Sequence, residues 1–308
     1  MDKKLKIIDL FAGIGGFHLA LHDLGHECVF ASEIDKNARI TYKENFIQRS
    51  PALFANNAYN DNILSITDPS TEIPDFDILC AGFPCQPFSQ AGFKRGFSEG
   101  KDDRGNMFFN ICSIIEAKRP KAFFLENVRH ILKHDNGRTF SIIKEYLKEK
   151  LGYSFAFKVV KASDHGLPQF RPRVFMVGFR GDMPEMPEFL FPQPTPLVMT
   201  MSDVWAGSCS REVGFTLRVG GKGSGINDRR NWDSYMVDGE ERTLSPQQGL
   251  RMMGFPEDFK FSVSNNQAMK QLGNSVAVNA VKATAEKIID YLDENSHFFK
   301  EVKQKEVA

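Results

Sequence analysis

An α/β fold with a parallel, doubly wound sheet is predicted for the first 180 residues of this 308-residue chain. Short apolar runs alternate there with longer amphipathic segments, which is typical of strands joined by crossover helices. A glycine-rich turn separates the first predicted strand from the first predicted helix. The chain is 42% apolar and 25% charged, as expected for a folded protein with a large core.

The elements follow from these patterns in chain order. Strands are expected at Leu5–Leu10, Cys28–Glu33, Phe76–Cys80, Ala122–Glu126, Ser154–Lys161 and Val174–Phe179. Helices are expected at Gly16–Leu24, Asp35–Phe46, Asn106–Ala117, Arg138–Lys150 and Val276–Leu292.

Composition divides the chain into three parts. Residues 1–180 carry the alternating pattern and are predicted to form a large domain. Residues 181–262 begin with a proline-rich stretch and continue without helical periodicity, so a small, loop-rich, mostly β domain is expected. Residues 263–308 contain the last predicted helix, which is expected to return to the large domain.

Charge and cysteine content limit the classes of protein. Lys and Arg number 39, as do Asp and Glu, which disfavours a purely electrostatic nucleic-acid binder but is compatible with one local basic cleft. The N-terminus reads as a strand instead of a signal sequence, and no apolar run has membrane-spanning length. The cysteines, odd in number and without a C-x-x-C pair, support neither disulfides nor a zinc site: Cys28, Cys80, Cys85, Cys112 and Cys209. A reduced, soluble, cytoplasmic protein without metal is expected.

The glycine-rich turn predicts a nucleoside cofactor. Gly13, Gly15 and Gly16 let the backbone approach a ligand at the helix N-terminus. Glu33 ends the second predicted strand, about 20 residues on, where a carboxylate can accept hydrogen bonds from ribose hydroxyls. The G-x-G-G spacing departs from the G-x-G-x-x-G pattern of dinucleotide sites, so S-adenosylmethionine is favoured, with NAD as the alternative.

The run from Gly82 to Ser89 places a cysteine where a strand ends. Rigid Pro84 precedes Cys85, and a loop rich in glycine and serine follows. Such a cysteine is positioned like a nucleophile, although an isolated cysteine is more often a small buried apolar residue. The other motifs decide between these two interpretations.

Five sequence blocks together resemble the DNA (cytosine-5)-methyltransferases of bacterial restriction–modification systems. Their order is more specific than any one of them, and they cover nearly the whole chain: Phe11–Gly16, Pro84–Gln86, Glu126–Val128, Gln169–Arg173 and Gly273–Val276. The resemblance implies a Rossmann-like, S-adenosylmethionine-dependent methyltransferase sheet. It also implies that residues 1–180 are the catalytic and cofactor-binding domain and 181–262 the target-recognition domain.

The resemblance implies a role for each catalytic residue. Cys85 is expected to add to C6 of cytosine, and Glu126 to bind N3 and the exocyclic amine. Arg173 is expected to contact the base O2, with Arg171 and Gln169 supporting it. Because a proton-bearing carboxyl is required at N3, we predict that burial raises the pKa of Glu126.

The cofactor site implied by the resemblance contains Phe11, Gly13, Gly15, Gly16, Glu33, Ile34, Asp61, Asn62, Ile63, Pro84, Met107, Asn274 and Ser275. Two positions depart from the family pattern. Where the family has Gly-Asp-Ile, this chain has Asp61-Asn62-Ile63, so either Asp61 or Asn62 accepts from the adenine amine. Ile34 stands where an aromatic residue often stacks on adenine.

Double-stranded DNA is the expected partner, with the target cytosine flipped out of the helix. Residues 86–104 are interpreted as a basic loop that closes over DNA. Residues 211–230 carry five cations against two acids among several glycines, which favours contacts to bases and phosphates. The candidate DNA contacts are Gln86, Ser89, Lys94, Arg95, Arg104, Gln169, Arg218, Lys222, Arg229 and Arg230.

Three other functions are compatible with parts of the sequence. A tRNA cytosine-5 methyltransferase would keep the chemistry and change the substrate. A nicotinamide oxidoreductase would leave Glu126 and the two arginines unexplained, and a non-catalytic DNA-binding relative would not need Cys85. We expect a monomer that modifies host DNA at the site of a cognate restriction endonuclease.

Overall fold

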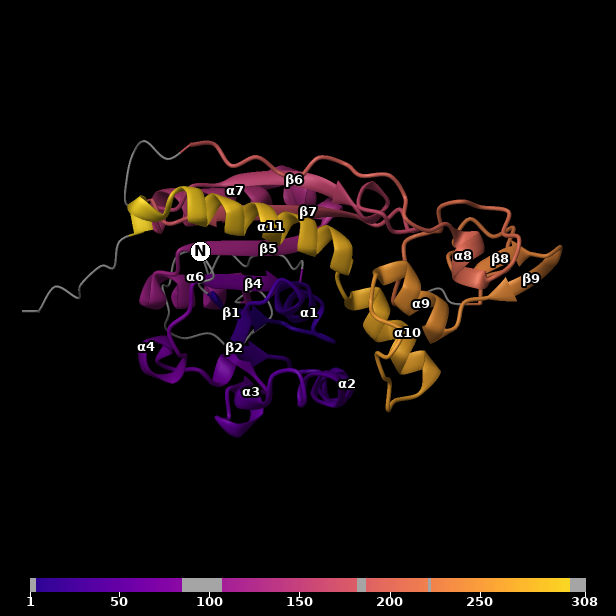
Figure 1. Cartoon of the computed structure of the whole chain (residues 1–308). Coiled ribbons are helices and arrows are strands. Elements are labelled where there is room, and N and C mark those ends of the chain that lie inside the picture. The colour runs from indigo at the N-terminus through magenta and orange to yellow at the C-terminus, as the bar shows by residue number, and fades with distance from the viewer. Residues whose placement is uncertain (1–3, 85–106, 182–186, 221–222, 300–308) are drawn as a thin grey trace, which may run out of the picture.

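The computed structural model describes residues 4–84, 107–181, 187–220 and 223–299 (Figure 1). Within these ranges, seven strands form one sheet in the order β3-β2-β1-β4-β5-β7-β6, and two more form a separate ribbon, β8-β9. The strands are β1 (Lys6–Leu10), β2 (Glu27–Ser32), β3 (Tyr59–Asn60), β4 (Ile78–Gly82), β5 (Ala122–Val128), β6 (Ala156–Lys161), β7 (Pro172–Phe179), β8 (Ser234–Val237) and β9 (Glu240–Thr243).

The described α-helices are α1 (Gly16–Asp23), α2 (Lys36–Phe46), α3 (Pro51–Ala55), α4 (Pro69–Glu72), α6 (Met107–Lys118), α7 (Arg138–Glu145), α8 (Met201–Trp205), α9 (Pro246–Met253), α10 (Asn265–Asn274) and α11 (Val278–Glu294). A π-helical turn, Tyr146–Lys150, continues α7. Short 3-10 turns occupy Ile63–Ser65, Arg129–Leu132, His134–Gly137, Ala162–Asp164 and Ser296–Phe299. None of the described helices has the length and apolar character needed to span a membrane.

The sheet has helices on both faces because neighbouring strand residues point to opposite sides. Phe124 of β5 packs in a core cluster with residues of α1, α2 and α11. Its neighbour Phe123 packs in a second cluster with residues of α6 and α7. Consecutive apolar residues within one strand therefore fill two separate cores, as expected for a doubly wound sheet.

One strand corrects the prediction of a parallel sheet. β7 pairs antiparallel with both β5 and β6, whereas the pairs β1-β2, β1-β4, β2-β3 and β4-β5 are parallel. The connection from β6 to β7, residues 162–171, contains one short 3-10 turn and no crossover helix. A connection of this kind returns the chain beside the strand it left, so the two strands run in opposite directions.

Residues 187–262 are loop-rich, as expected, but their regular structure is shared between helices and strands. Besides the β8-β9 ribbon, they contain α8 and α9. Both helices begin with a capping box, formed by Thr200 and Asp203 in α8 and by Ser245 and Gln248 in α9. Figure 1 shows this region at one end of the molecule, with α10 next to α9. The proposed boundaries at 180/181 and 262/263 stay a prediction.

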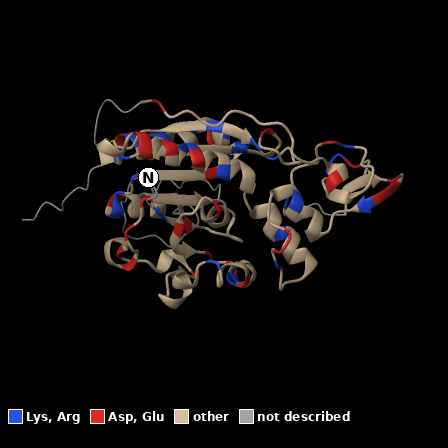
Figure 2. Cartoon of the chain, viewed as in Figure 1, with Lys and Arg blue, Asp and Glu red and all other residues tan. Residues whose placement is uncertain are grey.

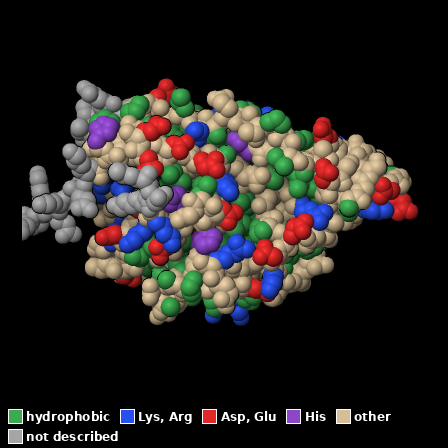
Figure 3. All heavy atoms as spheres, in the orientation of Figure 1, with side chains coloured by type: hydrophobic (Ala, Val, Ile, Leu, Met, Phe, Trp, Pro, Cys, Tyr) green, Lys and Arg blue, Asp and Glu red, His purple; other side chains and the backbone are tan. Residues whose placement is uncertain are grey.

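Charged residues are dispersed over the fold. Figure 2 shows Lys and Arg interspersed with Asp and Glu along most elements. On the face shown in Figure 3, cationic, acidic and apolar side chains lie next to one another, and neither sign of charge covers that face. Among the described residues of this face, the cations occur in small local groups.

Candidate active site

A cavity of ≈ 390 Å³ opens at the carboxyl ends of β1, β2, β4 and β5. In the sheet, β2 and β3 lie on one side of β1, and β4 and β5 lie on the other, so the strand order reverses direction between β1 and β4. Such a topological switch point is where open α/β sheets bind their ligands. The lining residues include many of those predicted from the sequence: Phe11, Gly13, Glu33, Ile34, Asn62, Ile63, Pro84, Met107, Glu126, Arg171, Arg173 and Asn274.

The glycine-rich loop is attached to Glu33. Gly13 N–H donates to Glu33 Oε2 across 2.8 Å, and Asp35 N–H donates to Glu33 Oε1 across 2.7 Å. Burial raises the pKa of Glu33. Gly13 adopts φ 56°, and a Cβ built there would meet no described atom within 4 Å. The backbone at Gly13 is thus open for close approach of a ligand.

Gly15 and Gly16, also predicted as cofactor residues, do not line the cavity among the described residues. Gly15 has φ 84°, and a Cβ there would lie 2.3 Å from Phe46 Cε2. A Cβ at Gly16 would lie 2.5 Å from Val276 Cγ2. These two glycines allow α1 to begin tightly against α2 and the segment before α11.

Asn62 and Asp61 are separated by the structure. Asn62 lines the cavity, and its Oδ1 accepts from Leu64 N–H across 3.0 Å, which caps the following 3-10 turn. Asp61 instead forms an exposed ion pair with Arg39, with 3.1 Å between Asp61 Oδ2 and Arg39 Nη1. Of the two residues, only Asn62 lines the cavity. Ser275, also predicted here, is buried and does not line the cavity among the described residues.

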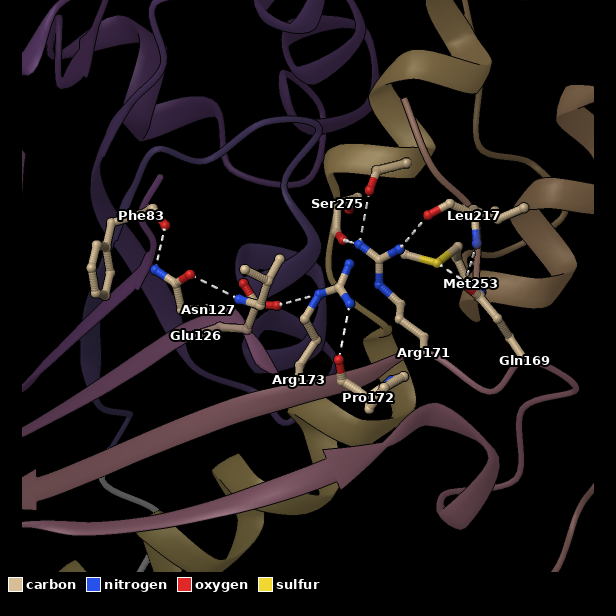
Figure 4. A network of polar contacts seen from close by, with 12 residues as sticks. Phe83, Glu126, Asn127, Gln169, Arg171, Pro172, Arg173, Leu217, Met253 and Ser275 are labelled. Carbon is tan, nitrogen blue, oxygen red and sulfur yellow. Dashed lines mark hydrogen bonds and ion pairs between the residues drawn. The ribbon is translucent and has the colours of Figure 1, made fainter. Parts of the chain in front are cut away.

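Glu126 and Arg173 form an ion pair in the cavity wall (Figure 4). Arg173 Nε lies 2.9 Å from Glu126 Oε1, and both side chains are largely buried. Burial raises the pKa of Glu126, although the nearby Arg173 and Arg171 cations act in the opposite direction. The direction agrees with the prediction from sequence. Asn127 joins the ends of β4 and β5, because its Nδ2 donates to Phe83 O across 2.8 Å.

Arg171 lines the same cavity but is bonded to the backbone. Its guanidinium donates to Leu217 O across 3.1 Å, to Gly273 O across 3.0 Å, and to Ser275 O. Only 2% of Arg171 is exposed, and burial lowers its pKa. These contacts are those of a residue that positions its neighbours.

Gln169, predicted to contact DNA, is instead fully buried, with 0% of its surface exposed. Its Nε2 donates to Met252 O across 3.0 Å, and its Oε1 accepts from Leu217 N–H across 3.0 Å. Gln169 therefore has no surface to offer DNA. Leu217 is thus hydrogen-bonded at both main-chain polar groups, its N–H to Gln169 and its C=O to Arg171, as Figure 4 shows.

The predicted DNA contacts Arg218, Arg229 and Arg230 are all exposed. Arg230 is paired with Asp228, with 2.7 Å between Arg230 Nη2 and Asp228 Oδ2, and this hydrogen bonding lowers the pKa of Asp228 to about 2. Arg218 donates to Arg230 O. The remaining candidates lie outside the described residues: Cys85, Gln86, Ser89, Lys94, Arg95, Arg104 and Lys222.

Sequence reasoning missed several cavity residues, chiefly Lys270 and Gln271 on α10. Lys270 Nζ pairs with Asp35 Oδ2 across 3.1 Å, and Thr41 Oγ1 donates to Gln271 Oε1 across 2.9 Å. These contacts attach α10 to α2. In the sequence, the feature that indicates helix α10 is Ser264, a favourable N-cap residue before an otherwise polar segment.

Comparisons with known proteins identify the family of the chain. The family model described as C-5 cytosine-specific DNA methylase matches residues 5–212 and 206–290. Type II methyltransferase M.DsaV of Dactylococcopsis salina is 38% identical over 98% of this chain and 92% of its own length. Type II methyltransferase M.HhaI of Haemophilus parahaemolyticus is 36% identical over 91% of this chain and 93% of its own.

Solved structures show the same fold at low identity. A putative DNA modification methyltransferase from an E. coli prophage has a TM-score of 0.70 at 20% identity, covering 94% of this chain and all of its own. A mutant of Spodoptera frugiperda DNMT2 has a TM-score of 0.69 at 18% identity, covering 93% of this chain and 100% of its own. The chain therefore belongs to the C-5 cytosine-specific DNA methylase family and is a DNA cytosine-5 methyltransferase.

Proposed function

We propose that this enzyme transfers a methyl group from S-adenosylmethionine to C5 of a flipped-out cytosine in a specific duplex sequence. The observation that carries this proposal is the Glu126–Arg173 pair, which shares one cavity with Glu33 and the open backbone of Gly13. One end of the cavity suits a nucleoside, and the other offers a carboxyl and a guanidinium to a planar base.

The cavity residues fit S-adenosylmethionine. Glu33 offers a carboxylate for ribose hydroxyls, and Ile34, 65% exposed, offers an apolar side chain for adenine. Asn62 presents an amide on the same wall. When bound there, the cofactor would supply a methyl group made electrophilic by a sulfonium.

Glu126 and Arg173 would stabilise charge on the cytosine ring. A protonated Glu126 donates to N3, which its raised pKa favours, and Arg173 donates to O2. These two donors withdraw electrons as a nucleophile adds at C6. C5 then becomes nucleophilic, and the nucleophile is eliminated once C5 has been methylated and has lost its proton.

Cys85 is proposed as that nucleophile. It is bonded to Pro84, which lines the cavity. Burial raises the pKa of the Cys28, Cys80 and Cys112 thiols, so these three disfavour the thiolate that the reaction requires. Cys209 is absent from the residues that line the cavity.

We also propose that residues 181–262 read the target sequence and that the modification protects host DNA from a cognate endonuclease. Three exposed arginines, Arg218, Arg229 and Arg230, support the first part. The similarity to type II methyltransferases supports the second.

The test is methylation of plasmid DNA in a host without cytosine-5 methylation. Bisulfite sequencing should reveal protected cytosines at one position within one short sequence, and mass spectrometry of the hydrolysed DNA should identify 5-methylcytosine. Cys85→Ser should abolish both signals while the purified variant still binds DNA. Complete conversion of every cytosine with wild-type enzyme, or turnover by Cys85→Ser, would contradict the proposal.

A further inference from the structure

A second cavity, of ≈ 480 Å³, lies between the segment that carries Arg218 and helix α10. Arg218, Gly223 and Trp232 line one side, and Asn266 and Lys270 line the other. Two cations and no acidic side chain are found among the described residues that line it. The cavity is therefore suited to an anion.

The wall formed by the Arg218 segment is built from buried contacts. Trp232 is 1% exposed, and its Nε1 donates to Gly220 O across 2.9 Å. Gly223 N–H donates to Asp233 Oδ2 across 2.9 Å, so the Asp233 carboxylate is hydrogen-bonded to the backbone of this wall. These contacts hold Gly220 and Gly223, on the described part of this wall, in place without a ligand, which lowers the entropy that binding would cost.

The opposite wall places Lys270 at an edge shared by both cavities. Asn266 and Lys270 are four residues apart on α10 and so lie on one helix face. Lys270 lines the first cavity as well as the second. An ion pair with Asp35 holds the Lys270 side chain in place. Because the ammonium has three N–H donors, it keeps further donors for a ligand.

The two cavities are neighbours across a tight backbone contact. A Cβ built at Gly273 would lie 2.8 Å from Arg218 O, so α10 meets the Arg218 segment with no room for a side chain. Arg171 bonds to Leu217 O and Gly273 O at the same junction. The two cavities therefore lie on either side of one junction, and Lys270 lines both of them.

We propose that the second cavity binds a backbone phosphate of the DNA strand next to the flipped cytosine, with Lys270 and Arg218 as its cationic donors. Flipping a base out of the stack requires the protein to hold the flanking backbone, and Lys and Arg are the usual phosphate ligands. This inference rests on the proposed action on duplex DNA. It assigns a DNA contact to α10, outside the segment proposed for target recognition.

The test compares Lys270→Gln with Lys260→Gln, both without cofactor, using a short fluorescent DNA duplex. Lys260 is an exposed lysine in the segment that precedes α10, and it is not among the residues that line either cavity. For Lys270→Gln, the slope of log affinity against log salt concentration should fall by about one, the signature of one lost phosphate contact. The Lys260→Gln slope should match that of the wild type. Equal slopes for Lys270→Gln and the wild type would overturn the inference.

A second variant guards against a folding defect. Asn266→Asp keeps the side-chain size and places a carboxylate opposite the proposed phosphate, so it should weaken DNA binding while the urea unfolding midpoint stays near that of the wild type. Unchanged DNA binding by this variant would also overturn the inference. If wild-type enzyme methylates plasmid cytosines while both variants bind DNA normally, the phosphate site fails and the proposed function stands.

Discussion

Arg173 reaches Glu126 from the antiparallel neighbour strand, with 2.9 Å between Nε and Oε1. Burial raises the pKa of Glu126, and the Arg173 cation opposes that rise. The pair thus holds a carboxyl that can donate a proton beside a guanidinium that cannot lose one. For a Glu126 that acts as an acid, the Arg173 cation would therefore help to set the pH range in which the carboxyl is protonated.

Replacing Glu126 by Gln should lower kcat by about 10²–10⁴-fold, the usual contribution of a general acid. Gln keeps the size of the side chain and one donor, so binding of DNA and cofactor should change little. Single-turnover methylation with saturating DNA measures the effect. A kcat within a few-fold of wild type would remove Glu126 from the mechanism.

The pH profile of Arg173→Met should shift in a defined direction. In the proposed mechanism the acid form of Glu126 is the active one, so the rate should fall as the pH rises through its pKa. Removing the Arg173 cation removes an influence that lowers this pKa, so the falling limb should move to higher pH while the maximal rate drops. Rate measurements across pH on the wild type and the variant test this; a limb that moves to lower pH would contradict it.

Arg171→Lys should destabilise the fold by about 2 kcal/mol or more. A single ammonium cannot reproduce the fork that reaches Leu217 O and Gly273 O together, so a buried carbonyl loses its donor. Urea unfolding measures the loss. The same exchange at exposed Arg138 should change the unfolding free energy by less than about 0.5 kcal/mol.

Gly15→Ala and Gly13→Ala should separate stability from cofactor binding. At Gly15 the added Cβ collides with Phe46 and φ is left-handed, so about 3 kcal/mol or more of stability should be lost. At Gly13 only the left-handed φ, about 1–2 kcal/mol, opposes the change, and the methyl group enters the space beside the cavity. Gly13→Ala should therefore lose less stability than Gly15→Ala, as measured by urea unfolding, yet bind S-adenosylmethionine more weakly by calorimetry.

Asn62→Ala should weaken S-adenosylmethionine binding about fivefold, the equivalent of one hydrogen bond of ~1 kcal/mol. Asp61→Ala should leave the affinity unchanged, because Asp61 pairs with Arg39 and does not line the cavity. Calorimetry on both variants distinguishes the two residues. The opposite ranking would assign the adenine contact to Asp61.

The elements around the cavity could be predicted because their local signals agree with the fold. Asp35 caps α2 by accepting from Asn37 N–H and Ala38 N–H, and Glu33 directly follows β2. The direction of β7 could not be predicted in this way. A strand buried on both faces has the same apolar pattern in either orientation, and only its pairing with β5 and β6 fixes its direction.

The second half of the chain was less predictable because its helices are short or polar. α9 is eight residues long, and the Ser245–Gln248 capping box was its clearest signal. α10 has Asn, Gln and Gly at many positions and depends on contacts with α2 and the Arg218 segment. The contacts with α2 join residues more than 200 positions apart, so no local pattern could place Lys270 or Gln271 in the cavity.

Gln169 and Arg171 hold Leu217 through its peptide N–H and C=O, groups that almost every amino acid has. The anchor therefore does not depend on which side chains follow in the loop. Residues after Leu217 can be exchanged while the hydrogen bonds from Leu217 to Gln169 and Arg171 are kept. On the proposal that this segment reads the target, a library that varies the residues after Leu217, selected by the DNA sequence that becomes methylated, should yield enzymes with new sequence specificities.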